Sequence, residues 1–222
     1  TETRWAIFNG DDVLTTYYPD QRALALEHPR VVGPPGAVFD YNKLHPQLLG
    51  LILERVSGMS VTAYLQSRLW EPLGMEYDGG WALDSDESGF EKMEAGLNAR
   101  AIDFAKFGVL VQREGEWGGR QVVSADWIRE STGPSTATLR PERYVDDFGR
   151  LIHDGGRGYY ALMWYGRLRG EGQPPDVAAA GDHGQYIYVS AAHDVVIVRN
   201  GAEYGISHEA WIEGFEAAAE LL

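Results

Sequence analysis

The chain has 222 residues, of which 44% are hydrophobic and 12% aromatic, enough to build one sizeable core or two small ones. Lys and Arg number 19 against 33 Asp and Glu, a net charge of −14 that disfavours binding to phosphate backbones and anionic membrane surfaces. The absence of cysteine excludes disulfides, thiolate nucleophiles and cysteine-ligated metals. No apolar run has the roughly 18 residues of a membrane span, so we expect a globular protein with no nucleic-acid partner and no membrane span.

The first half of the chain predicts a turn followed by two helices. Residues 1–32 show no sustained period and predict an irregular lead-in, after which the Pro- and Gly-rich residues 31–36 predict a rigid turn. Pro46 suits the first position of a helix that Gly58 ends, and a second helix is expected from the N-cap Ser60 to about Leu69, forming a helical hairpin with the first. One apolar stripe of the first helix contains Leu48, Leu49, Ile52, Leu53 and Val56.

The middle of the chain predicts loops and two further helices. The acidic residues 84–94 indicate a loop, residues 99–112 a helix with Ile102 and Leu110 inward, and Val122-Val123 a short strand. Ser124 is the expected cap of a brief helix. Residues 133–158 have no period and predict a long loop, a kind of segment that is usually functional or mobile.

The last third of the chain changes to β-prone sequence. Three antiparallel strands are expected at residues 159–165, 185–189 and 195–198. A terminal helix capped by Ser207 follows, and its apolar face contains Trp211, Ile212, Phe215, Ala218 and Leu222. The pattern predicts three regions: an irregular lead-in at 1–32, a helical region at 33–158, and strands with a packing helix at 159–222.

Several kinds of active site lack their sequence signature. The six histidines form no metal-binding spacing, so no metal is expected, and no phosphate-binding glycine loop is present, so no nucleotide cofactor is expected. The G-x-S-x-G elbow of α/β-hydrolases is absent, and no serine has a lysine three residues later.

Tyr41 and Lys43 form the first candidate site. They stand two positions apart at the mouth of the first predicted helix, directly after the Pro-Gly turn. A tyrosine close to a cation loses its proton more easily and can act as a general acid or base. The alternative is a partly buried tyrosine that anchors the start of the helix beside a solvated lysine.

The second candidate is the string Gly181-Asp182-His183-Gly184-Gln185. Two glycines around polar residues at the start of a strand allow a ligand to approach the backbone closely, and a strand N–H there could stabilise a developing oxyanion. The alternative is a β-bulge or tight turn that leads into a hairpin.

Acidic and aromatic residues suggest a carbohydrate-active alternative. Residues 84–94 and the pairs Asp11-Asp12 and Asp146-Asp147 could supply glycosidase carboxylates, but neighbouring acids on a loop are more often a solvated face. Tryptophan and tyrosine could line a sugar site, although at helix or strand spacing they more often belong to the core.

Several of these segments together resemble the serine β-lactamase-like hydrolases, a group that includes class C β-lactamases, DD-peptidases, esterases and 6-aminohexanoate-dimer hydrolase. The closest likeness is to the last branch, in which a G-x-H-G-Q string stands where β-lactamases have K-T-G. The resemblance extends from about Gly33 to the C-terminus and is carried by residues 34–41, 48–58, 70–75, 99–108, 181–185 and 195–198.

The resemblance implies an α/β (α+β) fold, with an antiparallel sheet flanked by helices, an inserted helical region, and the active site between them. It implies acyl transfer to a serine of an S-x-x-K motif, with proton movement by the lysine and by the tyrosine of a Y-x-[NS] motif. That tyrosine matches Tyr41. The oxyanion-holding strand matches Asp182, with His183 and Gly184 beside it.

Two departures from the family pattern shape the expected function. Lys43 stands where the family has Ser or Asn, and S-x-x-K is absent. We therefore expect a partner, an N-terminal segment or chain of the same precursor that carries S-x-x-K, and a small ester or amide substrate. A catalytically dead binding module and a hydrolase that uses Thr1 as nucleophile are the alternatives. The sequence fits a bacterial-type cytoplasm or periplasm equally.

Overall fold

The computed structural model describes residues 10–28 and 33–222, and its contacts group the chain into two compact units. The first unit contains Thr1–Val32, Tyr41–Glu71 and Asp78–Asn98, and the second contains Gly33–Asp40, Pro72–Tyr77 and Ala99–Leu222. These units cut across the three regions expected from the sequence, whose boundaries stay a prediction.

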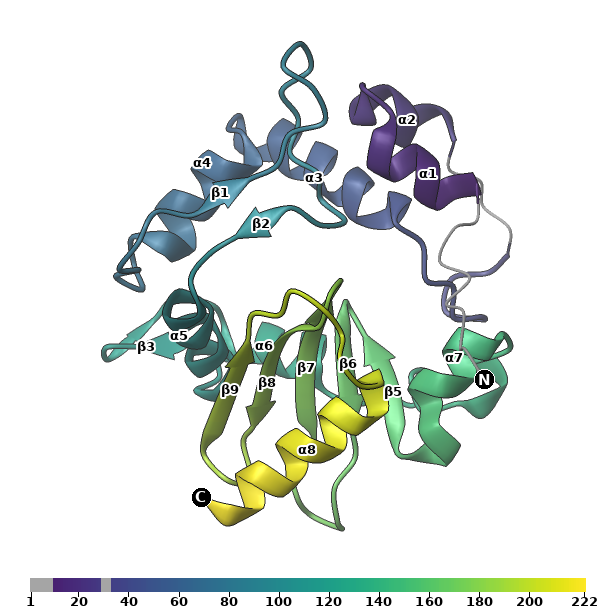
Figure 1. The fold of residues 1–222 in the computed structure, drawn as a ribbon, viewed down its shortest axis with the longest axis vertical. Coiled ribbons are helices and arrows are strands. Elements are labelled where there is room, and N and C mark those ends of the chain that lie inside the picture. The colour runs from purple at the N-terminus through teal and green to yellow at the C-terminus, as the bar shows by residue number, and fades with distance from the viewer. Residues whose placement is uncertain (1–9, 29–32) are drawn as a thin grey trace. The chain divides into compact units, whose positions relative to one another are not determined.

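The first unit is mainly helical (Figure 1). Its elements are α1 (Gly10–Tyr17), α2 (Gln21–Glu27), α3 (Leu44–Ser57), α4 (Val61–Leu65), the π-helix η1 (Gln66–Trp70), β1 (Gly80–Trp81) and β2 (Leu97–Asn98). The caps of the two central helices agree with the sequence, since Gly58 is left-handed with φ of 68° after α3 and Ser60 accepts a hydrogen bond from the Ala63 N–H at the start of α4.

The expectation of an irregular lead-in is wrong for residues 10–27, which form α1 and α2. The Asp20 side chain accepts a hydrogen bond from the Ala23 N–H and so starts α2, which buries Leu24 and Ala25. Two short helices give too few turns for a sustained period in the sequence. Thr1, and the remainder of the lead-in at residues 1–9 and 29–32, lie outside the described residues.

The expected hairpin of the two central helices is also wrong. The axis bends by 71° between α3 and the segment Val61–Trp70, so the second segment does not run back along the first. Pro46 lies in the first turn of α3 rather than at its first position. In the described part of the chain no single helix meets the length and apolarity of a membrane span, and α3 with Val61–Trp70 meets them only as a bent pair.

The second unit is built around a five-stranded antiparallel sheet with strand order β5-β6-β7-β8-β9. Its strands are β5 (Gly158–Ala161), β6 (Trp164–Arg167), β7 (Asp176–Gly181), β8 (Gln185–Ser190) and β9 (Val195–Arg199), with a separate hairpin of β3 (Glu116–Trp117) and β4 (Arg120–Gln121). Its helices are α5 (Ala101–Gln112), α6 (Ala125–Thr132), the 3₁₀ turn η2 (Pro141–Arg143), α7 (Asp147–His153), the 3₁₀ turn η3 (Asp154–Gly156) and α8 (His208–Leu221).

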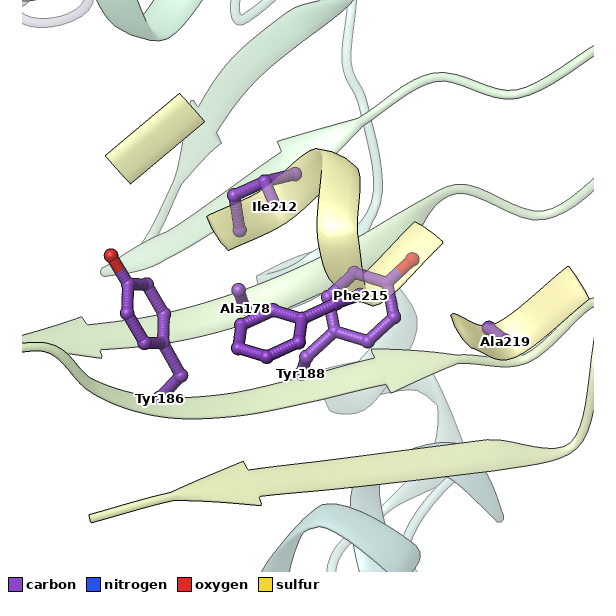
Figure 2. Packing of buried hydrophobic residues seen from close by; sticks show 6 residues of the cluster. All are labelled: Ala178, Tyr186, Tyr188, Ile212, Phe215 and Ala219. Carbon is purple, nitrogen blue, oxygen red and sulfur yellow. The ribbon is translucent and has the colours of Figure 1, made fainter. Parts of the chain in front are cut away.

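Alternation along the strands creates a three-layer arrangement in this unit. Tyr186 and Tyr188 of β8 face α8, whereas Ile187 and Val189 face α5 and α6 on the opposite side of the sheet. Figure 1 shows α8 lying across one face of the sheet. Figure 2 shows the packing on that face, where the α8 residues Ile212, Phe215 and Ala219 meet Ala178, Tyr186 and Tyr188. This agrees with the fold class expected from the sequence.

Five differences separate the second unit from the sequence expectations. Residues 159–165 form parts of two strands, because Leu162 and Met163 adopt left-handed φ values and turn the chain back. Strand β7 was not predicted, because its Ala-rich sequence has weak β-propensity. The expected loop at 133–158 contains α7, which is capped by Asp146. The expected strand at residues 122–123 lies just beyond β4. Two expected core residues, Ile102 and Leu222, are exposed.

A small cavity of about 50 Å³ lies where α8 begins, bounded by α7, β5 and β6. His208 lines this cavity, and its Nδ1 lies 3.0 Å from the Tyr186 hydroxyl. Burial, together with the charge of Arg167, lowers the pKa of His208 to about 4. The folded protein therefore keeps this imidazole neutral at pH values at which an exposed histidine is protonated.

The low pKa of His208 predicts a loss of stability in acid. In the unfolded chain His208 is protonated below about pH 6.5, whereas in the folded chain it stays neutral down to about pH 4. Stability that is present above pH 6.5 is therefore lost as the pH falls toward 4. At about 1.4 kcal/mol per pH unit the loss is about 3 kcal/mol. We expect His208→Gln to remove this part of the decrease in the free energy of unfolding, measured with urea at pH 7 and pH 4. An equal decrease in His208→Gln and in the wild type would contradict this, and His28→Gln, at an exposed histidine, is the control.

Candidate active site

The first group of candidate residues lies at the start of α3. The preceding turn forms as expected, with the Pro34 carbonyl accepting a hydrogen bond from the Ala37 N–H at 3.2 Å and Gly36 at φ of 74°. Tyr41, 43% exposed, lies three residues before the first residue of α3, and Lys43 occupies the N-cap position.

Asn42, between the two candidates, fixes the start of the helix. Its Oδ1 accepts a hydrogen bond from the Leu44 N–H at 2.8 Å, which satisfies one of the N–H groups that a helix leaves without an internal partner. Tyr41 and Lys43 therefore flank the residue that fixes the start of the helix. A tyrosine and a lysine on one short, anchored segment provide a proton donor or acceptor and a nearby positive charge.

The buried side chain of Gln47 binds the carboxylate of Glu94 close to this segment. Gln47, fully buried one turn after Lys43, donates from Nε2 to Oε2 of Glu94 and accepts at Oε1 from the Met93 N–H at 3.2 Å. Lys43 and Gln47 are four residues apart on α3 and so share a face. Burial raises the pKa of Glu94, while the positive charges of Lys92 and Lys43 act to lower it. Glu94 is thus an acidic neighbour of the first group.

The sequence offers little signal for Gln47 and Glu94. Gln47 is an uncharged residue within an apolar helix, and the acidic segment 84–94 was interpreted as a solvated face. That interpretation is wrong for three of its acids: Glu94 is largely buried, Glu91 is 2% exposed and accepts from the Thr62 N–H at 2.8 Å, and Asp84 accepts from the Gln21 N–H at 2.8 Å. These contacts are long-range, so only the fold creates them.

The second group, Asp182, His183 and Gly184, forms the turn between β7 and β8. His183 has φ of 61° and Gly184 has φ of 76°, so two successive residues are left-handed. Glycine is favoured at 184, because its φ is left-handed and a Cβ there would lie 2.3 Å from Nη1 of Arg199, which would have to move. Asp182 and His183 are exposed, and the Tyr204 hydroxyl donates to Oδ1 of Asp182 at 3.1 Å.

Gln185 joins this turn to the loop after β9. Its Nε2 donates to the carbonyls of Asp182 at 3.1 Å and Gly201 at 2.5 Å, and its Oε1 accepts from the Gly201 N–H at 2.9 Å. One amide side chain therefore satisfies backbone groups of two loops at once. The string of residues 181–185 forms a tight turn, which was the alternative to a ligand-binding segment. Hydrogen bonds from Gln185 also hold the backbone of this turn in place.

Arg199 reinforces the same junction from the end of β9. It donates from Nη1 to the Gly184 carbonyl and from Nη2 to the Glu203 carbonyl at 2.9 Å, and its guanidinium lies 4.2 Å from the centre of the Trp211 ring. Sequence reasoning included Gln185 in the string but missed Arg199, because Arg199 meets the turn from another strand of the sheet.

Strand β7 has an open edge next to this turn. Its pairing with β8 continues to Gly181, whereas its pairing with β6 ends at Ala178. In the described residues, the stretch from Ala179 to Gly181 therefore has no strand partner on the β6 side. Backbone groups on such an edge are available to a ligand.

The junction at Gln185 predicts a local change in backbone protection. We expect Gln185→Ala to speed amide hydrogen exchange in residues 181–185 and 200–204 and to lower the free energy of unfolding by about 1–3 kcal/mol, because three hydrogen bonds are lost. Exchange is measured by mass spectrometry. Gln173→Ala, in the exposed loop before β7, is the control, and unchanged protection in both segments would contradict the role given to Gln185.

The predicted site residues thus form two groups, one in each unit. Tyr41 and Lys43 belong to the first unit, and the residues of the β7–β8 turn belong to the second. In the described ranges, 10–28 and 33–222, no cluster of three or more His, Cys, Asp or Glu side chains could hold a metal ion. Thr1, the alternative nucleophile, lies outside these ranges.

Comparison with known proteins relates the chain to one family. Residues 4–201 match the family described as Beta-lactamase. The 6-aminohexanoate-dimer hydrolase of Paenarthrobacter ureafaciens is 28% identical over 164 residues, which is 72% of this chain and 38% of that protein.

Solved structures give the same relationship. A Bacillus anthracis protein provisionally named 6-aminohexanoate-dimer hydrolase superposes with a TM-score of 0.70 and 25% identity, over 90% of this chain and 47% of that one. A penicillin-binding protein from Bacillus halodurans superposes with a TM-score of 0.59 and 17% identity, over 95% of this chain and 68% of that one. The chain therefore spans less than half of the length of the two 6-aminohexanoate-dimer hydrolase relatives.

Proposed function

The chain belongs to the Beta-lactamase family, and from this membership we propose that it is part of a serine hydrolase that cleaves esters, amides or lactams through an acyl-enzyme. The observation that carries the proposal is the capped start of α3, which presents Tyr41 next to Lys43. In this proposal Tyr41 moves protons, and the end of β7 and its turn hold the oxyanion.

The proposed reaction has two halves. A serine hydroxyl attacks the carbonyl carbon while its proton passes to Tyr41, which acts as base together with the lysine of S-x-x-K, and the oxyanion that forms accepts hydrogen bonds from backbone N–H groups. The intermediate collapses as Tyr41 gives a proton to the leaving nitrogen or oxygen. Water then attacks the acyl carbon and gives up a proton, which returns by the same groups to the serine oxygen as the acid is released. In this proposal Lys43 supplies a positive charge beside Tyr41, and Glu94 is an acidic neighbour of Lys43.

The nucleophile in this proposal lies outside the 222 residues. No serine in the chain has a lysine three residues later, and the two 6-aminohexanoate-dimer hydrolase relatives are more than twice as long as the part that they share with it. We therefore propose that an N-terminal segment or chain of the same precursor supplies the S-x-x-K serine and lysine. The names of the relatives favour an amide as the substrate.

A binding module without catalysis is the second candidate, and the absence of S-x-x-K from the chain favours it. Denaturing intact-mass spectrometry of the native protein, before and after treatment with a fluorophosphonate, distinguishes the two. Uptake of the probe by a serine outside residues 1–222 would support the hydrolase. A protein that takes up no probe would favour the binding module, and an adduct on Thr1 would favour the N-terminal nucleophile.

A further inference from the structure

Three residues of the apolar stripe of α3 are exposed, although the sequence predicts that the stripe packs inward. Leu49 and Ile52 are each 56% exposed and Val56 is 76% exposed. The fully buried positions of the helix are instead Leu44, Gln47 and Gly50, which lie on another face. An amphipathic helix normally turns its apolar stripe toward a core, so this helix has a second packing face that the described residues leave uncovered.

The spacing of this face matches that of a helix–helix interface. Leu49, Ile52 and Val56 follow one another at intervals of three and four residues, and His45, also exposed, lies one turn before Leu49. Positions at alternating intervals of three and four form the seam along which a second helix packs. Met59, 39% exposed and just beyond the helix, continues the same interval. From His45 to Met59 the seam is about 20 Å long, at about 1.5 Å per residue.

We propose that this seam, defined by His45, Leu49, Ile52, Val56 and Met59, is the docking site of an apolar helix from the part of the same protein that lies outside these 222 residues. This rests on the proposed function in one respect, namely that the docked segment carries the serine nucleophile. Three further observations favour this occupant over a second copy of the chain or a membrane.

The first observation is the length of the relatives, since the chain corresponds to only 38% and 47% of the two 6-aminohexanoate-dimer hydrolases. More than half of such a protein is therefore available to cover the seam. The second is position, because the seam begins four residues after Tyr41, so a helix docked along it passes close to the phenol that needs a nucleophile. The third is charge: a net charge of −14 opposes association with a second copy and with an anionic membrane.

Photochemical cross-linking in the native, full-length protein tests the docking. The variant Ile52→p-benzoylphenylalanine is expected to cross-link in high yield to a peptide outside residues 1–222 of the same polypeptide or precursor. Arg55→p-benzoylphenylalanine, at an exposed position of α3 off the seam, is the matched control and is expected to give at least tenfold less of this product.

Each other product would overturn the proposal. A link to residues 44–59 of an isotopically distinct second copy would identify a homodimer seam, and a link to residues 99–222 would assign the seam to the second unit. A link to lipid, or no yield above that of the Arg55 control, would remove the helix partner. Fluorophosphonate labelling of the same sample reports the nucleophile separately, so a docked segment without a reactive serine overturns the function and leaves the docking intact.

Discussion

In the native, full-length protein, Tyr41→Phe is expected to lower kcat/KM for ester or amide hydrolysis by about 10³, within the 10²–10⁴ that general acid–base catalysis typically contributes. The ring and its packing stay, while the hydroxyl that is proposed to take and return the proton is removed. The loss should fall on kcat, with KM changed by less than about threefold, because the substrate does not need that proton until the transition state. Initial rates over a range of substrate concentrations give both constants.

The matched control for this substitution is Tyr17→Phe, in a tyrosine of α1 that is 76% exposed. It removes the same hydroxyl from the same kind of residue and should leave both constants unchanged. Activity of Tyr41→Phe within threefold of the wild type would contradict the role proposed for the phenol. If neither protein turns over substrate but both take up fluorophosphonate, the substrate class is wrong rather than the tyrosine.

The second large effect is expected for stability, at Asp176 in β7. This side chain is 1% exposed, accepts a hydrogen bond from the Tyr188 hydroxyl at 2.5 Å, and forms an ion pair with Arg169, whose side chain is 10% exposed. Asp176→Ala leaves a buried guanidinium without this partner and a buried hydroxyl without an acceptor. We expect the free energy of unfolding to fall by about 3–5 kcal/mol, measured by urea denaturation at pH 7.

The control for Asp176→Ala is Asp147→Ala, in an aspartate of α7 that also pairs with an arginine. Both members of the Asp147–Arg150 pair are exposed, so solvent screens the interaction and no measurable change is expected. Equal losses in the two variants would show that burial does not set the strength of the ion pair in β7. Tyr188→Phe should lower the free energy of unfolding by only about 1 kcal/mol, because it removes one hydrogen bond and leaves the ion pair.

Local signals in the sequence predicted several helix ends and part of the sheet. The caps at Gly58, Ser60, Ser124 and Ser207 depend on bonds within a few residues, so their positions could be read from the chain. Alternation in residues 185–189 and the β-branched run 195–198 were sufficient for two strands. The Ala-rich β7 carries no comparable pattern, and its place in the sheet comes from pairing on both sides.

The residues of the candidate site likewise divide into those that the sequence identified and those that only the structure revealed. Tyr41 and Lys43, and the turn from Asp182 to Gly184, were identified because each motif is contiguous in the chain. Gln47, Glu94 and Arg199 were not, because each acts through a contact with a segment at least 15 residues away. Their assigned roles stay predictions for the experiments above.

By itself the sequence determined the family, the α+β character and the contiguous motifs, because these depend on residue type and short-range spacing. Only the tertiary structure decided which apolar residues are buried. The stripe of α3 satisfies the sequence criterion for a core face, yet Leu49, Ile52 and Val56 are exposed while the polar Gln47 is buried. A hydrophobic period shows that a face must be covered, but which face a given set of neighbours covers depends on long-range contacts that no local pattern contains.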